Sequence, residues 1–376
     1  MRLPRIAPLA ILLLGLTALM PGRTSGAGDP LDRINHIIVI YQENWSFDGL
    51  FGRFPGANGL ANAGEAVRQV DRNGRPYPTL PPAIDTRLRP PGPDPRIATD
   101  LPMEPFHLAQ FVSPTDFTGD LVHAFYQEQH QINGGKMDRF IAWSNAGGLV
   151  MSYYDATNWP VGRLAQQYVL ADNFFHAAFG GSFLNHQWLI CTCTPVYPDA
   201  PQEIRAQLDA NGFLVRDGQV TPDGYVVNTS YSINPPRNPR VTDPRQLVPG
   251  QVSPTIGDRL SERRVSWAWY AGGWNDAVAG RAHPLYQYHH QPFVYFANYA
   301  EGTEGRLRHL KDEQDFLRDL GGNDLPAVVF IKPLGPDNEH PNYATPLQGQ
   351  QHVAMLVRAV MNSPYLGERR DDHHLR

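Results

Sequence analysis

Three short apolar runs constrain the fold of this chain more than any other feature. Residues 34–41 are rich in β-branched side chains, and residues 265–270 and 327–331 have the same character. Consecutive apolar residues over such lengths are typical of strands buried on both faces of a sheet. Residues 348–361 have the apolar spacing of a helix that ends before a Ser-Pro pair. Strands that alternate with helices predict an α/β fold with a mainly parallel central sheet flanked by helices.

Polar segments that follow the predicted strands are where a functional site is expected. In open α/β sheets, ligands bind outside the carboxyl ends of the strands. Residues 42–48 follow the first run, and residues 336–341 follow the run that ends at Ile331. In a third segment, residues 178–186, two glycines precede a serine and a predicted helix. Together these segments predict a catalytic rim along one edge of the sheet.

Two of the segments carry groups suited to a divalent cation and to a nucleophile. Glu43 offers a carboxylate and Asn44 an amide oxygen, both hard ligands, although polar turns of this kind are also ordinary caps. Ser182 would lie at a helix N-terminus, where backbone N–H groups bind phosphate; its ordinary alternative role is that of an N-cap. The sequence contains no Gly-x-Ser-x-Gly elbow, so a Ser182 nucleophile would need activation by a metal ion.

Five of the fourteen histidines lie in polar, turn-adjacent segments: His123, His186, His289, His290 and His340. A single histidine is more often a surface or packing residue than a catalytic one. His123 follows Asp120 by three residues, and His340 directly follows Glu339. A neighbouring carboxylate can orient an imidazole ring, so these two histidines are the stronger candidates.

Charge and cysteine content exclude two classes of protein. The chain has 32 basic and 37 acidic residues, a formal net charge of −5, and no basic run. Binding of nucleic acid through phosphate neutralisation is therefore not expected. Cys191 and Cys193 are too few for a disulfide framework or a cysteine zinc module. Only one residue separates them, and a bridge at this spacing strains the geometry, so we expect buried free thiols.

The first 27 residues have the features of a secretory signal. Arg2 and Arg5 precede an apolar stretch, residues 7–20, and small residues follow up to Ala27. A stretch of about 14 residues is short for a bilayer span, which needs roughly 20. We therefore expect cleavage near Ala27, export to the periplasm or beyond, and no stable membrane insertion.

Five segments together resemble a known family. They are residues 36–52 (HIIVIYQENWSFDGLFG), 120–140 (DLVHAFYQEQHQINGGKMDRF), 170–188 (LADNFFHAAFGGSFLNHQW), 289–296 and 325–349. In this order they resemble the bacterial phosphoesterase family that contains acid phosphatases and non-haemolytic phospholipases C, within the alkaline-phosphatase superfamily. The Gly-Gly-Ser-Phe-Leu-Asn-His stretch looks closer to the acid phosphatases, because a threonine-containing version is usual in the phospholipases.

The resemblance implies a site with one divalent metal ion. Glu43 and Asn44 match the first ligand pair of the family. Ser182 matches the metal-bound nucleophile, which attacks phosphorus and forms a phosphoserine intermediate. The implied substrate is a phosphate monoester or a phospholipid. The identity of the metal and the oligomeric state stay open.

The resemblance also assigns histidines around the phosphate. His123 and His340 match such positions. His290 corresponds more weakly, because His289 is equally placed. One of these side chains would protonate the departing alcohol before water hydrolyses the intermediate.

One phosphoesterase domain is implied over residues 28–366, with loop-rich insertions near residues 60–110 and 198–254. The first insertion has eight prolines between residues 76 and 95, which predicts an extended surface loop. Residues 367–376 form an aberrant tail that departs from the family.

In family members, a strand and then an acidic pair that completes the metal site follow the helix corresponding to residues 348–361. Here the chain reads GERRDDHHLR from residue 367. One back-translation of residues 368–376, read one nucleotide later, encodes a strand that leads into an acidic codon. We therefore hypothesise a truncation or frameshift near residue 367, which the nucleotide sequence of the 3′ end decides. With Glu43 as the one carboxylate ligand, we expect weak metal binding and little or no phosphatase activity.

Three functions remain open at this point. The first is a secreted, metal-dependent phosphoric ester hydrolase of acid-phosphatase type, disabled here by the missing ligands. The second is a phosphodiesterase of phospholipase C type with the same core. The third is a non-catalytic, truncated remnant that binds ligands or a partner through an aromatic-rich surface (Trp267, Trp269, Tyr270 and Trp274).

Overall fold

A computed structural model of the chain describes residues 30–322 and 324–367. The predicted signal peptide, residues 1–27, and residues 368–376 of the predicted tail lie outside the described residues. The chain divides into two compact units, residues 1–35 and 36–376. In the first, the structure describes a short 3₁₀ helix, Pro30–Arg33. The second contains the sheet and the candidate site.

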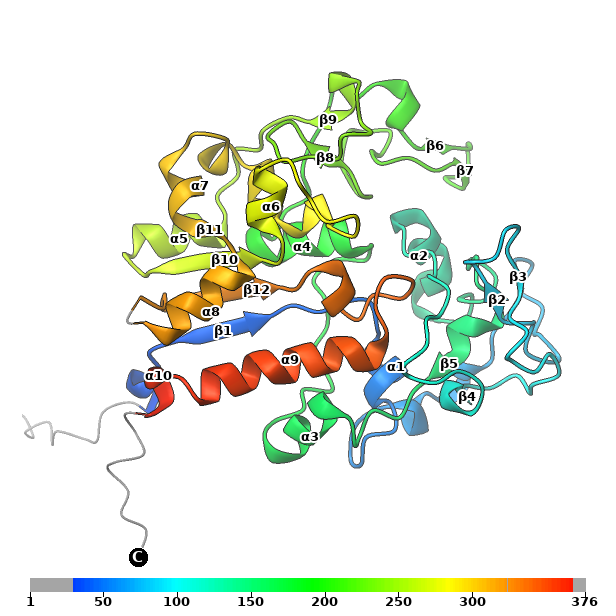
Figure 1. The fold of residues 1–376 in the computed structure, drawn as a ribbon. Coiled ribbons are helices and arrows are strands. Elements are labelled where there is room, and N and C mark those ends of the chain that lie inside the picture. The colour runs from blue at the N-terminus through cyan, green and yellow to red at the C-terminus, as the bar shows by residue number, and fades with distance from the viewer. Residues whose placement is uncertain (1–29, 323, 368–376) are drawn as a thin grey trace, which may run out of the picture. The chain divides into compact units, whose positions relative to one another are not determined.

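The central sheet consists of four parallel strands in the order β1-β12-β10-β11 (Figure 1). Their bounds are β1 Ile37–Ile40, β10 Trp267–Ala271, β11 Leu310–Asp312 and β12 Val328–Lys332. The predicted parallel sheet and its three apolar strands are confirmed.

The expectation of burial on both faces is correct for β10 but wrong for β1. Every residue of β10 is buried, whereas Ile37 in β1 is 55% exposed. Among the described strands, β1 lies at one edge of the sheet and pairs only with β12. An edge strand has a neighbour on one side alone, which leaves part of its surface uncovered.

Ten α-helices lie within the described residues: α1 Phe47–Phe51, α2 Phe125–Ile132, α3 Pro160–Gln167, α4 Ser182–Cys191, α5 Ile256–Glu262, α6 Trp274–Val278, α7 Glu304–His309, α8 Glu313–Gly321, α9 Pro346–Met361 and α10 Pro364–Gly367. The predicted helix over residues 348–361 is α9. It begins two residues earlier, because Thr345 caps it by accepting a hydrogen bond from the backbone of Gln348 and Pro346 fits the first turn.

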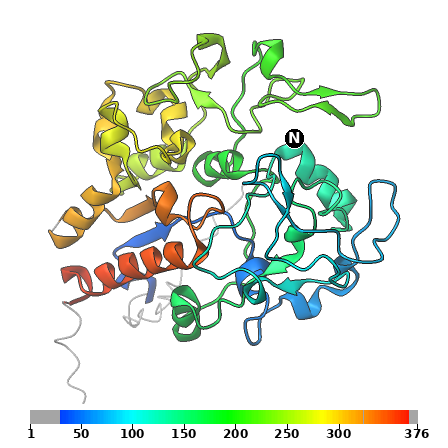
Figure 2. The same ribbon diagram turned by 45° about the vertical axis from the view of Figure 1, so that its right-hand side comes forward.

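Successive side chains of the strands point to opposite faces of the sheet and enter two different apolar cores. On one face, Trp267 and Trp269 of β10 pack with residues of α4, including Ile190. On the other, Tyr270 packs with residues of α8 and α9, including Leu356. Figures 1 and 2 show α9 and α4 on different sides of the sheet. The proposed aromatic-rich surface is therefore wrong, because the side chains of Trp267, Trp269, Tyr270 and Trp274 are buried.

Four small two-stranded sheets lie outside the central sheet: β2 Ile84–Asp85 with β3 Gly92–Pro93, β4 Phe106–His107 with β5 Ser152–Tyr153, β6 Gln207–Leu208 with β7 Leu214–Arg216, and β8 Tyr231–Ser232 with β9 Leu247–Val248. The prediction that residues 76–95 form a surface loop is correct only in part. Leu80, Ala83 and Asp94 are buried there, and a separate apolar core anchors the segment. The Asp94 carboxylate also binds the Arg96 guanidinium at 2.7 Å.

The prediction of free thiols is wrong. Cys191 and Cys193 form a disulfide, with 5.0 Å between their Cα atoms. Cys191 ends α4, and Thr192 adopts a left-handed conformation with φ 52°, which turns the chain back on itself. This turn brings the two Cα atoms within the usual range for a bridge, about 4.4–6.8 Å. No helix in the described part of the chain is long and apolar enough to cross a membrane.

Candidate active site

The loops that follow β1 and β12 meet at the carboxyl end of the sheet. Glu43 comes three residues after β1, and its backbone N–H donates to the carbonyl of Asn338, beyond β12, at 3.1 Å. The Asn338 amide in turn donates to Glu43 Oε1 at 3.2 Å. Because β1 and β12 are parallel neighbours, their ends place these two loops side by side.

The Glu43 carboxylate is buried between two basic side chains. His290 Nε2 lies 2.9 Å from Oε1, and Lys332 Nζ lies 3.3 Å from Oε2. Burial alone would raise the pKa of Glu43, but His290 and Lys332 hold it well below its usual value. Burial lowers the pKa of His290 to about 4, so its ring is neutral at pH 7. Burial lowers the pKa of Lys332, and the Glu43 carboxylate opposes this shift, so the ion pair in this site is Glu43 with Lys332.

Asn44 connects two histidines from distant parts of the chain. Its Nδ2 lies 3.2 Å from His340 Nε2 and 3.3 Å from His123 Nδ1. His340 Nδ1 donates to the carbonyl of Pro341 at 2.7 Å, which leaves Nε2 as an acceptor for the Asn44 amide. Asp120 Oδ1 lies 3.7 Å from His123 Nδ1. His123 Nδ1 donates to the carbonyl of Leu121 at 2.6 Å, so the Asn44 amide donates to His340 and only contacts His123. Its Oδ1 is left for another partner.

Ser182 is the first residue of α4, and its hydroxyl contacts a buried histidine. Gly181 occupies the N-cap, so the alternative of Ser182 as an N-cap is wrong. Ser182 Oγ lies 3.1 Å from His289 Nε2. Burial lowers the pKa of His289 well below its usual value, so the ring is neutral and can accept the hydroxyl proton. A β-carbon at Gly181 would lie 2.3 Å from the carbonyl oxygen of His123, so a glycine is needed for α4 to begin this close to His123.

Two groups of side chains in the described residues could hold a cation. One consists of Glu43, His186 and His290, and the other of Asp120, His123 and His340. Within each group the ligand atoms lie within 4.8 Å of one another. His186 extends from α4, where its Nδ1 lies 2.6 Å from the Ser182 carbonyl, and its ring stacks on that of His290.

All the residues predicted from the sequence lie in one network of contacts. Ser182 contacts His289, whose neighbour His290 contacts Glu43, and Asn44 contacts His123 and His340. The structure places His289, rather than His290, against the serine hydroxyl.

Sequence reasoning missed Lys332 and Asn338. Lys332 is the last residue of β12, directly after the predicted strand 327–331, and it is fully buried. A lysine at the carboxyl end of an apolar strand, on the expected rim, is the signal that could have identified it.

The donor atoms present fit a divalent cation. Glu43 Oε2 is buried without a hydrogen-bond partner among the described residues, apart from its ion pair with Lys332. An ionised carboxylate and a free amide oxygen are ligands that hard cations prefer. Lys332 supplies a competing positive charge at the same carboxylate.

Comparison with known proteins finds relatives along most of the chain. The model of the phosphoesterase family matches residues 34–369. A non-hemolytic phospholipase C from Burkholderia pseudomallei is 24% identical over 351 residues, which cover 88% of this chain and 42% of that protein. Phospholipase C A from Mycobacterium tuberculosis is 26% identical over 361 residues, 90% of this chain and 56% of that protein. The chain thus spans about half the length of the curated relatives it matches.

Proposed function

Because the chain belongs to the phosphoesterase family, we propose that it hydrolyses phosphoric esters with Ser182 as the nucleophile. The observation that carries the proposal is the 3.1 Å contact between Ser182 Oγ and the neutral imidazole of His289. A serine hydroxyl is a weak nucleophile until a base removes its proton, and this contact supplies the base. A monoesterase of acid-phosphatase type is the first candidate, because the Gly-Gly-Ser-Phe-Leu-Asn-His stretch at the start of α4 resembles that of acid phosphatases.

The chemistry proceeds in two displacements at phosphorus. His289 Nε2 accepts the hydroxyl proton while Ser182 Oγ forms a bond to phosphorus, and the bond from phosphorus to the alcohol oxygen breaks. His123, beside Asp120, donates a proton to that oxygen, and the alcohol leaves. His123, now neutral, then takes a proton from water while the water oxygen bonds to phosphorus. The bond from phosphorus to Ser182 Oγ breaks, and His289 returns its proton to that oxygen, so phosphate leaves and Ser182 is free again. His340 and Asn44 hold each other in place next to this reaction.

Glu43, Asn44 and Ser182 would hold one divalent cation. The ion, when bound, lowers the pKa of the serine hydroxyl and offsets the charge of the phosphoryl oxygens. Lys332 provides a fixed positive charge beside Glu43, and the first turn of α4 directs backbone N–H groups toward bound phosphate. We also propose that the enzyme is exported, because residues 1–27 have the features of a secretory signal.

A phosphodiesterase of phospholipase C type is the second candidate. It is supported by the names of the relatives, which are phospholipases C. The two candidates share the Ser182 chemistry and differ only in whether the phosphorus carries one ester or two.

The decisive experiment assays the purified chain on p-nitrophenyl phosphate and on phosphatidylcholine vesicles. We expect low turnover that EDTA abolishes and that an added divalent cation raises. With Glu43 as the only carboxylate that we propose as a ligand among the described residues, half-saturation is expected near 10⁻⁴–10⁻³ M cation, as in weak oxygen-ligand sites. Several cations should each be tested at 10 mM, on the order of ten times the upper end of this half-saturation range. If neither ester is then hydrolysed, the non-catalytic alternative is favoured.

His289→Asn should lower kcat by about 10²–10⁴-fold, the usual contribution of a positioned general base. The loss should be greatest at neutral pH and should decrease as pH rises, because hydroxide increasingly replaces the missing base. His283→Asn is the matched control, because His283 is exposed and its contact is with the backbone of Leu285. Full activity of His289→Asn would assign the base to another side chain.

A further inference from the structure

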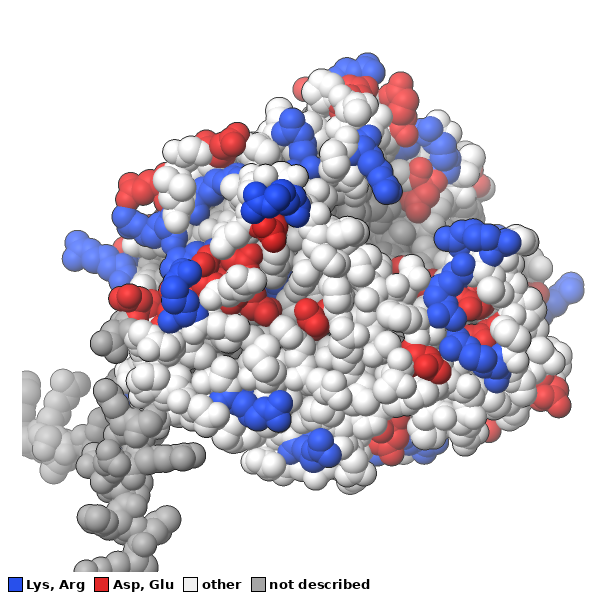
Figure 3. All heavy atoms as spheres, in the orientation of Figure 1, with Lys and Arg blue, Asp and Glu red and all other residues white. Residues whose placement is uncertain are grey.

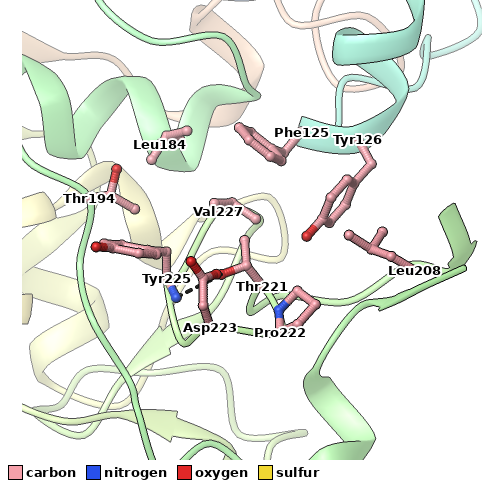
Figure 4. A pocket seen from close by; sticks show the side chains of 10 residues that line it. All are labelled: Phe125, Tyr126, Leu184, Thr194, Leu208, Thr221, Pro222, Asp223, Tyr225 and Val227. Carbon is pink, nitrogen blue, oxygen red and sulfur yellow. Dashed lines mark hydrogen bonds between the residues drawn. The ribbon is translucent and has the colours of Figure 1, made fainter. Parts of the chain in front are cut away.

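A cavity of about 520 Å³ lies between the first turns of α2 and α4. Figure 4 shows Phe125 and Tyr126 of α2 on one side, Leu184 of α4 on another, and residues 221–227 along its base. In the space-filling view the surface is hollowed between the regions of α2 and α4 (Figure 3). Neither the family nor the relatives' names assign a role to this cavity.

The lining is mostly apolar and contains no basic residue. The apolar and aromatic lining side chains are Phe125, Tyr126, Leu184, Leu208, Pro222, Tyr225 and Val227. The polar ones are Thr194, Thr221 and Asp223, and Thr221 Oγ1 already donates to Asp223 Oδ1 at 2.5 Å. A lining of this kind suits an apolar group. The Asp223 carboxylate, without a nearby lysine or arginine in the lining, disfavours an anionic one.

The cavity adjoins the candidate active site through both helices. Leu184 lies two residues after Ser182, and Phe125 lies two residues after His123. Leu184 packs over Gly180, while Gly181 lies directly against the His123 carbonyl. The first turns of α2 and α4 therefore contact each other beside Ser182 and His123, and the residues that follow in each helix line the cavity. The Phe125 backbone N–H also donates to Asn228, which follows Val227 in the lining, and this bond fixes the cavity base to α2.

We propose that this cavity binds the apolar part of the ester's alcohol, an alkyl or aryl group, while the phosphoryl group lies at Ser182. The inference rests on the proposed function and deepens it by naming the substrate class. Esters of sugars and nucleotides are poor substrates on this view. Their hydroxyl groups would lose hydrogen bonds to water against Leu208 and Val227, which offer none in return.

The test is the dependence of kcat/KM on chain length for ethyl, butyl and hexyl phosphate. Each buried methylene is worth about 0.8 kcal/mol, so kcat/KM should rise about fourfold per methylene while the chain fits. Leu208→Asn should flatten this dependence, because Leu208 is a half-buried member of the lining. Leu307→Asn is the matched control, since Leu307 is 78% exposed on α7, and it should leave the dependence unchanged.

The possible outcomes separate this inference from the proposed function. Equal kcat/KM for all three esters, or an unchanged dependence in Leu208→Asn, overturns the inference while the hydrolase proposal stands. If none of the esters is hydrolysed, the hydrolase proposal fails, and binding of ethyl- and hexylphosphonate by calorimetry still decides the inference. If hexylphosphonate binds more tightly than ethylphosphonate, and this difference is lost in Leu208→Asn but kept in Leu307→Asn, the cavity binds the apolar group. Equal binding of the two phosphonates overturns it.

Discussion

Ser182→Ala is expected to abolish ester hydrolysis, with kcat falling by on the order of 10⁴–10⁶-fold, as when a serine hydrolase loses its nucleophile. The variant lacks the oxygen that forms the bond to phosphorus. Its free energy of unfolding should fall by only about 1 kcal/mol, from the lost hydrogen bond to His289, because Gly181 rather than Ser182 caps α4 and no side chain caps that helix end. The measurements are kcat on p-nitrophenyl phosphate, acid-quench trapping of phosphoserine, and urea unfolding.

Thr255→Ala is the matched control for this prediction. Thr255 caps α5 in a capping box with Asp258, so its loss should cost about 0.5–2 kcal/mol of stability while kcat per folded molecule is kept. A Ser182→Ala variant that unfolds as easily as Thr255→Ala and keeps its turnover would make Ser182 a structural residue. The nucleophile assignment would then be wrong.

Glu43→Gln and Lys332→Met should each lower the free energy of unfolding by about 3–5 kcal/mol. Either change leaves a buried charge without its partner, and such charges are costly. The double variant Glu43→Gln/Lys332→Met should regain most of this stability, because no unpaired charge remains. Only stability should recover in the double variant. Activity should stay low, because the amide that replaces the Glu43 carboxylate is an uncharged ligand for the cation.

The pH dependence of unfolding provides a second measure of the same pair. The pKa of Glu43 is lower in the folded state than in the unfolded chain, so its stabilising contribution is complete above the unfolded value. That contribution is lost as pH falls through the folded value, and the double variant should lack this part of the acid transition. If the double variant lost as much stability as the two single variants together, Glu43 and Lys332 would not be coupled. Restored hydrolysis in the double variant would exclude Glu43 as a cation ligand.

The sequence predicted the sheet and the place of the site because both follow from local patterns. Apolar runs marked β1, β10 and β12, and the polar residues after β1 and β12 lie at the same edge because the strands are parallel. Glycines before Ser182 marked the start of α4. These signals depend on neighbouring residues only, so one sequence is enough to find them.

Features that depend on tertiary packing were not predicted. The strand β11 is only three residues long and has a lysine at its centre, so no apolar run marks it. The choice between His289 and His290 depends on how the short 3₁₀ turn Tyr288–His290 packs against α4, which spacing cannot give. The disulfide depends on the left-handed turn at Thr192. The roles of Glu43, Asn44, Ser182, His123, His290 and His340 stay predictions, and the variants above test them.

The buried pair of Glu43 and Lys332 has a consequence for the order of assembly. Many small metal-binding domains stay unfolded until their ion arrives, because binding of the ion supplies the free energy of folding. Here the ammonium group already neutralises the carboxylate within the folded core, so the polypeptide could fold first and acquire the proposed ion later. Loading then becomes an exchange of one positive charge for another, and its equilibrium is set by competition with an internal lysine rather than by folding.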